Sequence, residues 1–221
     1  MEMAERKGFR DGLENEIYIP YMQGNVGSVL SGLSKGSKRN LRIIEKGIRL
    51  LMGLSLKGYE GKSVGTVLLI GDLENLRRNT SQLVANPFKG YFRKYNITDP
   101  QHRRTFEAYS RLDGAMMIDH KGFISSAGRV IDIKEDRQSG VLVSDQDVRR
   151  GRGKGTRDKA ARYITSVTKT VAVTLSSDGD ITVYESGKSL GKLEWRVLHL
   201  CSEGQFRQFL DFMESERSEK E

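Results

Sequence analysis

Cysteine, proline and tryptophan are scarce in this chain of 221 residues, which contains one, three and one of them, respectively. Because Cys201 is the only cysteine, an intramolecular disulfide is excluded and a cytoplasmic location is expected. No apolar run approaches the roughly 18 residues that a membrane-spanning helix needs. The charged N-terminus also leads into no apolar stretch of the kind found in signal peptides. We therefore expect a protein that has no membrane partner.

Signatures of nucleic-acid binding are missing as well. The sequence contains no paired cysteine and histidine spacing of a zinc site and no aromatic sheet motif. Trp195 lies outside any alternation of aromatic and basic residues that would stack single-stranded bases. The net charge of +8 favours an anionic partner, but it does not distinguish polyphosphates, nucleic acid and an acidic surface. A nucleic-acid-binding function would rest on charge alone, and we do not expect it.

Composition and glycine placement predict one main domain with two appendages. Hydrophobic residues make up 37% and charged residues 30% of the chain, proportions typical of a globular protein. Glycines interrupt residues 1–37, which we interpret as an N-terminal arm. Residues 38–200 carry the periodic segments and form the predicted domain. Residues 201–221 contain a capping box and end in charged residues, so we expect a C-terminal helix and a charged tail.

Hydrophobic periodicity predicts several helices and strands within this domain. A helix with one apolar face is expected from Lys38, and two further helices begin at Asp99 and Thr156 with capping residues. Asp72 ends an apolar run and is either a helix cap or a side chain that faces a ligand. The expected strands cover residues 64–70, 115–118, 122–125, 130–133, 171–175 and 180–184. The prediction is an α/β fold with a central mixed β-sheet flanked by helices.

The segment Leu112-Asp-Gly-Ala115, at the head of a predicted strand, is the first of two candidate binding segments. A carboxylate beside glycine and alanine leaves room for a phosphate or a metal ion to approach the backbone. An isolated Asp-Gly pair, however, is more often a turn that precedes a strand. The segment by itself leaves both interpretations of Asp113 open.

A glycine-rich basic loop within residues 151–161 is the second candidate. The loop opens directly onto a predicted helix N-terminus. There, backbone amides, the helix dipole and the side chain of Arg157 or Lys159 would converge on phosphate oxygens. The spacing is not that of a P-loop. An ordinary basic loop before a capped helix explains the segment almost as well, so the segment alone does not decide.

Four segments taken together resemble the diadenylate cyclase domain, the nucleotide-binding domain that also stands at the front of the DNA-integrity scanning protein. They occur in the family's order, and the resemblance covers roughly residues 41–195. The first two segments are similar to the archaeal stand-alone branch of the family. The four are residues 65–72 (Gly-Thr-Val-Leu-Leu-Ile-Gly-Asp), 86–91 (Asn-Pro-Phe-Lys-Gly-Tyr), 112–115 and 155–161 (Gly-Thr-Arg-Asp-Lys-Ala-Ala).

The resemblance implies a central mixed sheet flanked by helices and a reaction between two ATP molecules. Two domains meet face to face, each with one ATP, so a homodimer or a larger homo-oligomer is implied. The 3′-hydroxyl of each nucleotide attacks the α-phosphate of the other, pyrophosphate leaves, and cyclic di-AMP forms. Because such catalysis depends on positioning and on neutralising charge, a divalent metal ion, Mn²⁺ or Mg²⁺, is the expected cofactor.

The resemblance also implies roles for individual residues. Asp113 would hold the metal ion and help to activate the 3′-hydroxyl, while Gly114 and Ala115 would pass close to the nucleotide. Asp113, Arg157 and Lys159 are the expected catalytic residues. The motif at the start of the last helix supplies further nucleotide-binding positions, which are Gly155, Thr156, Arg157, Asp158 and Lys159.

Departures from the family pattern bear on catalytic competence. Asp158 stands where the motif Gly-Thr-Arg-His-Arg has histidine, and a carboxylate beside polyphosphate is repulsive unless a cation intervenes. Lys159 replaces the second arginine, keeping the charge but losing the bidentate fork. Ser176 lies in the turn where the family usually has a metal-binding glutamate, and the nearest carboxylate is Asp178. The alternative function is that of a catalytically silent member that binds ATP or cyclic di-AMP as a sensor or partner subunit.

Overall fold

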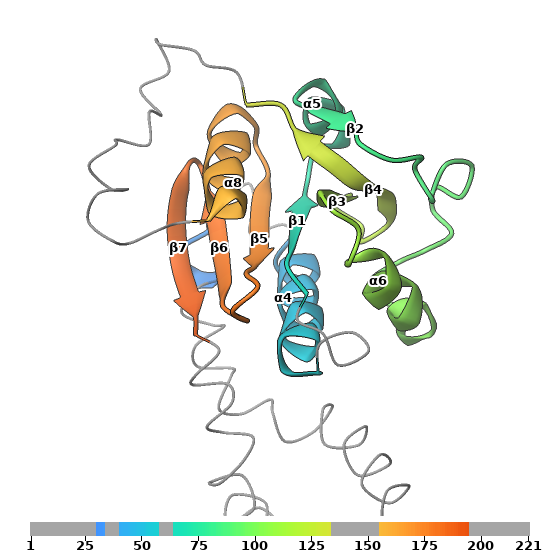
Figure 1. The fold of residues 1–221 in the computed structure, drawn as a ribbon, viewed down its shortest axis with the longest axis horizontal. Helices are drawn as coiled ribbons and strands as arrows, with labels where there is room; N and C mark the ends of the chain where they lie inside the picture. The colour runs from blue at the N-terminus through green and yellow to red at the C-terminus, as the bar shows by residue number, and fades with distance from the viewer. Residues whose placement is uncertain (1–29, 34–39, 58–63, 134–154, 195–221) are drawn as a thin grey trace, which may run out of the picture.

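The computed structural model describes residues 30–33, 40–57, 64–133 and 155–194, which are built around one seven-stranded sheet (Figure 1). The strand order is β2-β4-β3-β1-β5-β6-β7. Strands β1 and β3 run parallel, and every other neighbouring pair is antiparallel. The predicted mixed sheet is thereby confirmed. Its strands are β1 (Thr66–Ile70), β2 (Thr80–Gln82), β3 (Ala115–Ile118), β4 (Ile124–Ile131), β5 (Val171–Leu175), β6 (Ile181–Glu185) and β7 (Lys188–Leu193).

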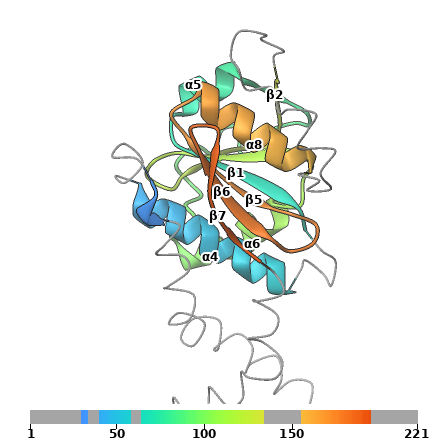
Figure 2. The ribbon, with the colours of Figure 1, turned by 90° about the vertical axis from the view of Figure 1, so that its left-hand side faces the viewer.

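Helices cover both faces of the sheet. Figure 2 shows α4 (Leu41–Lys57) and α8 (Thr156–Val167) on opposite sides. Helix α6 (Arg103–Tyr109), preceded by the 3-10 turn η1 (Pro100–His102), shares the α4 side because its buried phenylalanine joins the same apolar cluster. Helix α5 (Leu73–Arg78) packs on the α8 side through its leucines. The domain therefore has three layers, with the sheet between two layers of helices.

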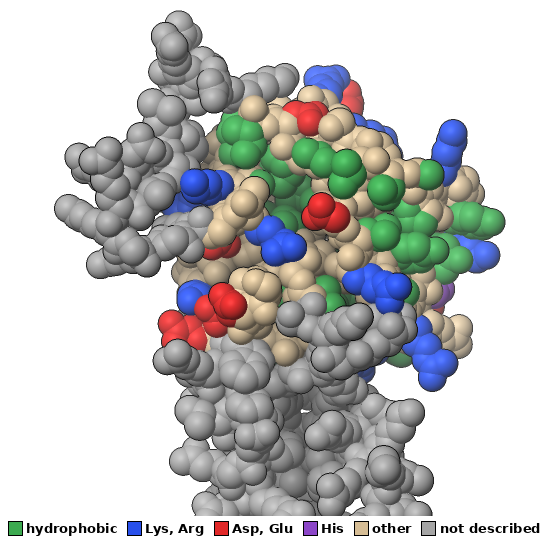
Figure 3. All heavy atoms as spheres, viewed as in Figure 1, with side chains coloured by type: hydrophobic (Ala, Val, Ile, Leu, Met, Phe, Trp, Pro, Cys, Tyr) green, Lys and Arg blue, Asp and Glu red, His purple; other side chains and the backbone are tan. Residues whose placement is uncertain are grey.

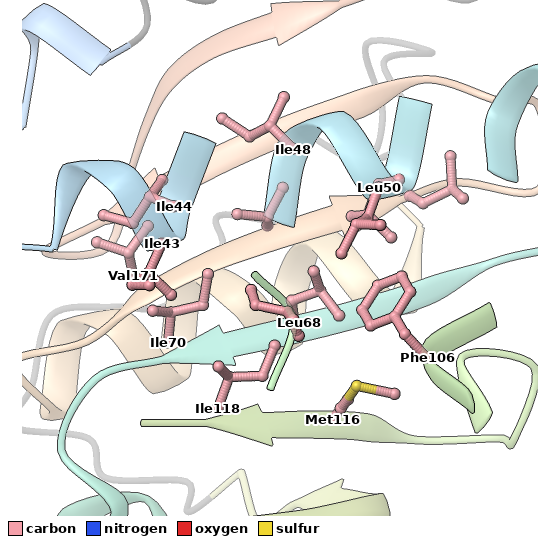
Figure 4. Close-up of a cluster of buried hydrophobic side chains, with 14 of the residues drawn as sticks. Ile43, Ile44, Ile48, Leu50, Leu68, Ile70, Phe106, Met116, Ile118 and Val171 are labelled. Atoms are coloured by element: carbon pink, nitrogen blue, oxygen red, sulfur yellow. The ribbon is translucent and has the colours of Figure 1, made fainter. Parts of the chain in front are cut away.

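Strand β1 is buried on both faces, as its uninterrupted apolar sequence predicts. Leu68 and Ile70 point toward α4, where they join Ile44 and Ile48 in the cluster drawn in Figure 4. Leu69 points the other way and belongs to the cluster beneath α8. Each of these five side chains is at most 1% exposed. Full burial of such a side chain contributes roughly 1.5–3 kcal/mol relative to exposure, so β1 is the centre of the core.

The turn after β1 decides between the two interpretations of Asp72. Its carboxylate accepts hydrogen bonds from the backbone N–H groups of Glu74, at 3.0 Å, and Asn75, at 3.3 Å. Asp72 is therefore the N-cap of α5. Neither α5 nor β2 is indicated by the sequence pattern, because residues 73–82 are mostly polar and have no apolar period.

Strand β4 corrects an expectation, because it is one strand where the sequence predicts two. The small residues between 125 and 128 give no clear strand pattern, yet they are buried, and Ser126 pairs with Met117 of β3. Gly128 has a φ of +69° within the strand, and the β3–β4 register shifts twice. A strand with such irregularities cannot be recognised from alternation alone. Strand β7 is also absent from the predicted elements.

The remaining predicted elements have mixed outcomes. The hairpin β5–β6 is confirmed. Asp99 caps a helix as expected, since its carboxylate accepts from the N–H of Gln101 at 2.9 Å, but the helix is divided into η1 and α6. The domain boundaries near residues 37 and 200 and the predicted C-terminal helix lie outside the described residues. Among the helices that are described, none is long and apolar enough to span a membrane.

Candidate nucleotide-binding site

The parallel pair β1–β3 brings two candidate segments to one end of the sheet. Val67 pairs with Ala115, so Gly65 and Asp113, each two residues earlier, precede the two strands at the same end. The antiparallel strand β5 finishes at this end too, and the turn at Ser176 follows it. We call this place the β1–β3 edge. Segments distant in the sequence thus meet here.

Gly114 is required by the close approach of β4 to the head of β3. Its φ is +104°, and a Cβ at this position would lie 2.6 Å from the carbonyl oxygen of Arg129 and 2.8 Å from its nitrogen. No side chain fits between two backbones at these distances. Ala115, the next residue, is 2% exposed and packs beneath α8. The Asp-Gly-Ala sequence therefore leads into β3 at a place where the backbone of β4 leaves no room for a side chain at residue 114.

Asp113 is exposed at this entry, so its carboxylate is available to a ligand. Within the described residues, no three side chains of histidine, cysteine, aspartate or glutamate gather into a metal site. Mg²⁺ commonly binds to proteins through one or two carboxylates and completes its shell with substrate phosphates and water. A single exposed carboxylate fits that type of binding if phosphates bind at the same edge of the sheet. The residues present are therefore compatible with a metal ion that arrives with a nucleotide.

Helix α8 begins at this edge, and no side chain among the described residues caps its first turn. The N-cap is Gly155, in an extended conformation, and Thr156 is the first helical residue. The expectation that Thr156 itself caps the helix is therefore wrong by one residue. The N–H groups of Asp158 and Lys159 both bond the carbonyl of Gly155. The positive end of the helix dipole thus lies at Gly155 and Thr156, which are both exposed. This arrangement is suited to binding an anion.

Arg157 extends from this turn to the start of β1. An ideal Cβ on Gly65 would lie 2.6 Å from both Cζ and Nη1 of Arg157. The guanidinium group therefore packs directly against the backbone that precedes β1. Because Gly65 and Asp113 precede the two parallel strands at the same end, Arg157 and Asp113 share the β1–β3 edge. Lys159, on the same turn as Arg157, is partly buried.

Asp158 points elsewhere, toward the surface of the sheet. Its Oδ1 accepts a hydrogen bond from the Thr174 hydroxyl of β5 at 3.2 Å. On neighbouring β6, burial raises the pKa of the Tyr184 hydroxyl, and the charge of Asp158 and a hydrogen bond to it raise it further. Sequence reasoning does not single out Thr174 or Tyr184. The one sequence feature that could have identified Thr174 is that it is a polar residue within an otherwise apolar strand.

The turn between β5 and β6 contains the second departure from the family pattern. The Ser176 hydroxyl accepts a hydrogen bond from the N–H of Asp180 at 3.1 Å, and its carbonyl accepts one from the N–H of Gly179 at 3.0 Å. The Asp180 carboxylate lies 2.5 Å from the Lys192 ammonium of β7. Asp178, the carboxylate noted from the sequence, is exposed. The sequence did not identify Asp180 as a paired carboxylate, because its partner Lys192 lies on a different strand.

Exposed apolar side chains lie near the same edge. Leu83 and Val84 follow β2 and are 52% and 43% exposed. A Cβ on Gly128 would lie 2.6 Å from a Val84 methyl group and 3.7 Å from the carbonyl oxygen of Asp113, so Val84 is close to the Asp113 backbone. Figure 3 shows hydrophobic side chains on the right-hand side of this face, with basic side chains among them.

These features define an α/β nucleotide-binding domain, with an open helix start, an arginine and an exposed aspartate at one sheet edge. The chain belongs to the DAC family, because the family's sequence model, described as DisA bacterial checkpoint controller nucleotide-binding, matches residues 54–189. This match contains more than half of the chain and includes the three segments from β1, β3 and α8. The family resemblance drawn from the sequence is thereby confirmed.

Two curated archaeal proteins, both named diadenylate cyclase, are similar to this chain. The protein from Methanocaldococcus jannaschii is 35% identical over 157 residues, which are 71% of this chain and 46% of that protein. The protein from Haloferax volcanii is 28% identical over 174 residues, or 78% of this chain and 60% of that protein. The chain thus spans about half the length of these relatives. A crystal structure of a DacA double mutant from Staphylococcus aureus aligns with 77% of this chain and 97% of its own, at 19% identity and a TM-score of 0.44.

Proposed function

We propose that this protein is a metal-dependent diadenylate cyclase that converts two ATP molecules into cyclic di-AMP and two pyrophosphates. The observation that carries the proposal is the meeting of Asp113, Arg157 and the open start of α8 at the β1–β3 edge. The diadenylate cyclase names of the two archaeal relatives support the same reaction. ATP as substrate and a single cysteine agree with a cytoplasmic location.

Phosphate binding is assigned to the first turn of α8. Backbone N–H groups at Gly155 and Thr156, the helix dipole and the Arg157 guanidinium are arranged for a polyphosphate. Lys159 adds positive charge from the same turn. At the other side of the edge, the compact Gly114 and Ala115 leave the nucleotide close to the head of β3. These groups hold the triphosphate and neutralise charge as pyrophosphate leaves.

Asp113 is assigned to the attacking 3′-hydroxyl. Two new bonds form between the 3′-oxygens and the α-phosphorus atoms, and the two α–β phosphoanhydride bonds break. The proton of each attacking hydroxyl must leave, and an exposed carboxylate at the edge is suited to direct it. A divalent ion held by Asp113 and the phosphates would supply further charge neutralisation.

The reaction needs two nucleotides that face each other, and a homodimer supplies them. Leu83 and Val84 support this arrangement, because exposed apolar side chains beside Asp113 provide a surface to bury. Two copies that meet through the β1–β3 edge would bring their nucleotides together. We therefore assign ATP and a second copy of this chain as the partners.

A catalytically silent nucleotide-binding protein is the second candidate. Its support is the β5–β6 turn, where Ser176 stands in place of the family's glutamate and uses its hydroxyl within the turn. The nearby Asp180 carboxylate is paired with Lys192. If metal binding at this turn is essential, the protein would bind ATP or cyclic di-AMP without turnover.

Incubation of the protein with ATP and either Mn²⁺ or Mg²⁺, followed by mass spectrometry, tests the two candidates. Formation of cyclic di-AMP with pyrophosphate supports the cyclase. Binding of ATP or cyclic di-AMP without product, under both metals, supports the silent member instead. Replacement of Ser176 by glutamate would then be expected to restore turnover.

A further inference from the structure

The Asp158 side chain contacts β5, whereas that of its neighbour Arg157 reaches the start of β1. We propose that Asp158 is a positioning residue: it anchors the first turn of α8 to the sheet and so directs Arg157 to the β1–β3 edge. This inference rests on the proposed function only in assigning phosphates to Arg157. It gives a reason for aspartate at the position where the family motif has histidine.

The anchor is a shielded hydrogen bond between a helix and a strand. Thr174 is only 2% exposed, and its hydroxyl donates to Asp158 Oδ1 at 3.2 Å. Tyr184, on the neighbouring strand, is 1% exposed, and the charge of Asp158 helps to raise the pKa of its hydroxyl. The hydrogen bond with Thr174 therefore holds the first turn of α8 against β5. Hydrogen bonds to a charged group are stronger than those between neutral groups, and more so away from water.

Cations on the same side of the domain offset the Asp158 charge. The pKa of Lys192 is raised, chiefly by its hydrogen bond to Asp180, and Asp158 adds a smaller contribution. The Arg162 guanidinium lies 5.5 Å from the centroid of the Tyr184 ring. Negative charge at Asp158 thus faces the β5–β7 half of the sheet.

Helix geometry connects this anchor to Arg157. Successive side chains on an α-helix leave the axis about 100° apart. Asp158 is held over β5, while Arg157 reaches the start of the adjacent strand β1 at Gly65. Two contacts on neighbouring strands fix the rotation of the first turn. Without the Asp158 contact, Arg157 would lose the orientation that places it against Gly65.

The test compares variants that differ in charge and in hydrogen bonding. Asp158→Ala and Thr174→Val each remove the anchor, and each should raise the Kd and KM for ATP roughly tenfold, the effect of losing one hydrogen bond to a charged group. The kcat should change less. Asp158→Asn keeps the acceptor without the charge and should recover most of the affinity, as should Thr174→Ser. The double variant Asp158→Ala/Thr174→Val should be no weaker than Asp158→Ala alone, because Asp158→Ala already removes the contact with Thr174.

Three results would overturn the proposal. If Asp158→Asn is as weak as Asp158→Ala, the charge itself acts on the nucleotide or metal. If Thr174→Val binds ATP normally, the contact is irrelevant to Arg157. A loss of thermal stability without any change in ATP affinity would show a purely structural role. Because ATP binding is measured apart from product, a wild-type protein that binds ATP without turnover sinks only the cyclase assignment. Failure of the wild-type protein to bind ATP would overturn both.

Discussion

The guanidinium group of Arg157 occupies the space that a side chain at residue 65 would fill. A Cβ on Gly65 would lie 2.6 Å from Arg157 Cζ and Nη1, distances that real Cβ atoms do not show. The backbone before β1 therefore has no side chain at residue 65, and the guanidinium group of Arg157 packs directly against it. Glycine at residue 65 matters for what it allows Arg157 to do, in addition to its own conformation.

Substitution of Gly65 by alanine should accordingly displace Arg157. We expect the Kd for ATP to rise about tenfold, the equivalent of one charge-assisted hydrogen bond, with little change in the melting temperature. Isothermal titration with ATP measures this effect. Gly53→Ala is a matched control, because its Cβ would also approach an arginine, Arg103, at 3.3 Å, but on helix α4. Equal ATP binding by Gly65→Ala and wild type would contradict the role given to Arg157.

Substitution of Asp113 by asparagine should abolish product while the fold remains intact. Loss of a positioned proton acceptor and metal ligand lowers turnover by about 100-fold or more. Cyclic di-AMP formation and circular dichroism measure the two quantities. Glu74→Gln on α5 serves as a control, since it alters only an exposed pair with Arg78. An Asp113→Asn variant with normal turnover would remove Asp113 from the mechanism.

Gly114→Ala should be strongly destabilising. Its φ of +104° disfavours any side chain, and the added Cβ would meet the Arg129 backbone at 2.6 Å. We expect the free energy of unfolding to fall by at least about 2 kcal/mol, as measured in urea. Gly155→Ala is the comparison, because no atom lies within 4 Å of its Cβ position. Similar unfolding midpoints for the two variants would be inconsistent with the described β3–β4 approach.

Leu83→Asp should weaken self-association and, with it, turnover at low protein concentration. In a two-fold dimer the substitution introduces two like charges into one interface, which weakens association by tenfold or more. Sedimentation velocity and concentration-dependent rates measure the effect. Val167→Asp changes a comparably exposed residue, 42% against 52%, at the far end of α8. A dimer unaffected by Leu83→Asp would place the interface elsewhere.

Because the pKa of Tyr184 is raised in the folded state, the free energy of unfolding should fall in strong alkali. Its pKa is raised by burial and then by Asp158, so the folded state keeps the proton after the unfolded chain has released it. The contribution of Tyr184 to stability is complete below about pH 10, the pKa of an unperturbed tyrosine, and is lost as pH rises further. Tyr184→Phe should therefore show a shallower decline in unfolding free energy above pH 10. Identical slopes for both proteins would contradict this assignment.

Local patterns were sufficient for the parts of the fold that follow a simple period. The apolar run of β1 and the turn before β6 predicted a buried strand and a hairpin. The β4 strand escaped prediction because Gly128 and the small residues before it interrupt alternation, and its pairing with β3 is irregular. Helix α5 also escaped prediction, because the Asp72 cap marks its start but no apolar period follows it.

The candidate site divides in the same way. The motifs identified Asp113 and Arg157 as residues, but only the strand register brings them to one edge. The direction of Asp158 depends on Thr174, which is 16 residues further along the chain and on a different element. No spacing rule connects a helix N-terminus to a threonine inside a strand. Contacts of this kind become visible only after the sheet is assembled.

The two outer strands of the sheet have a consequence for assembly. At one border β2 has three residues, and at the other β7 carries Lys188 and Lys192. A short border and a lysine-bearing border both resist continuation of the hydrogen-bonded ladder into a neighbouring molecule. Copies are thereby steered away from open-ended stacking in the plane of the sheet. The dimer proposed through the strand ends would instead be a closed pair, which cannot grow into a filament.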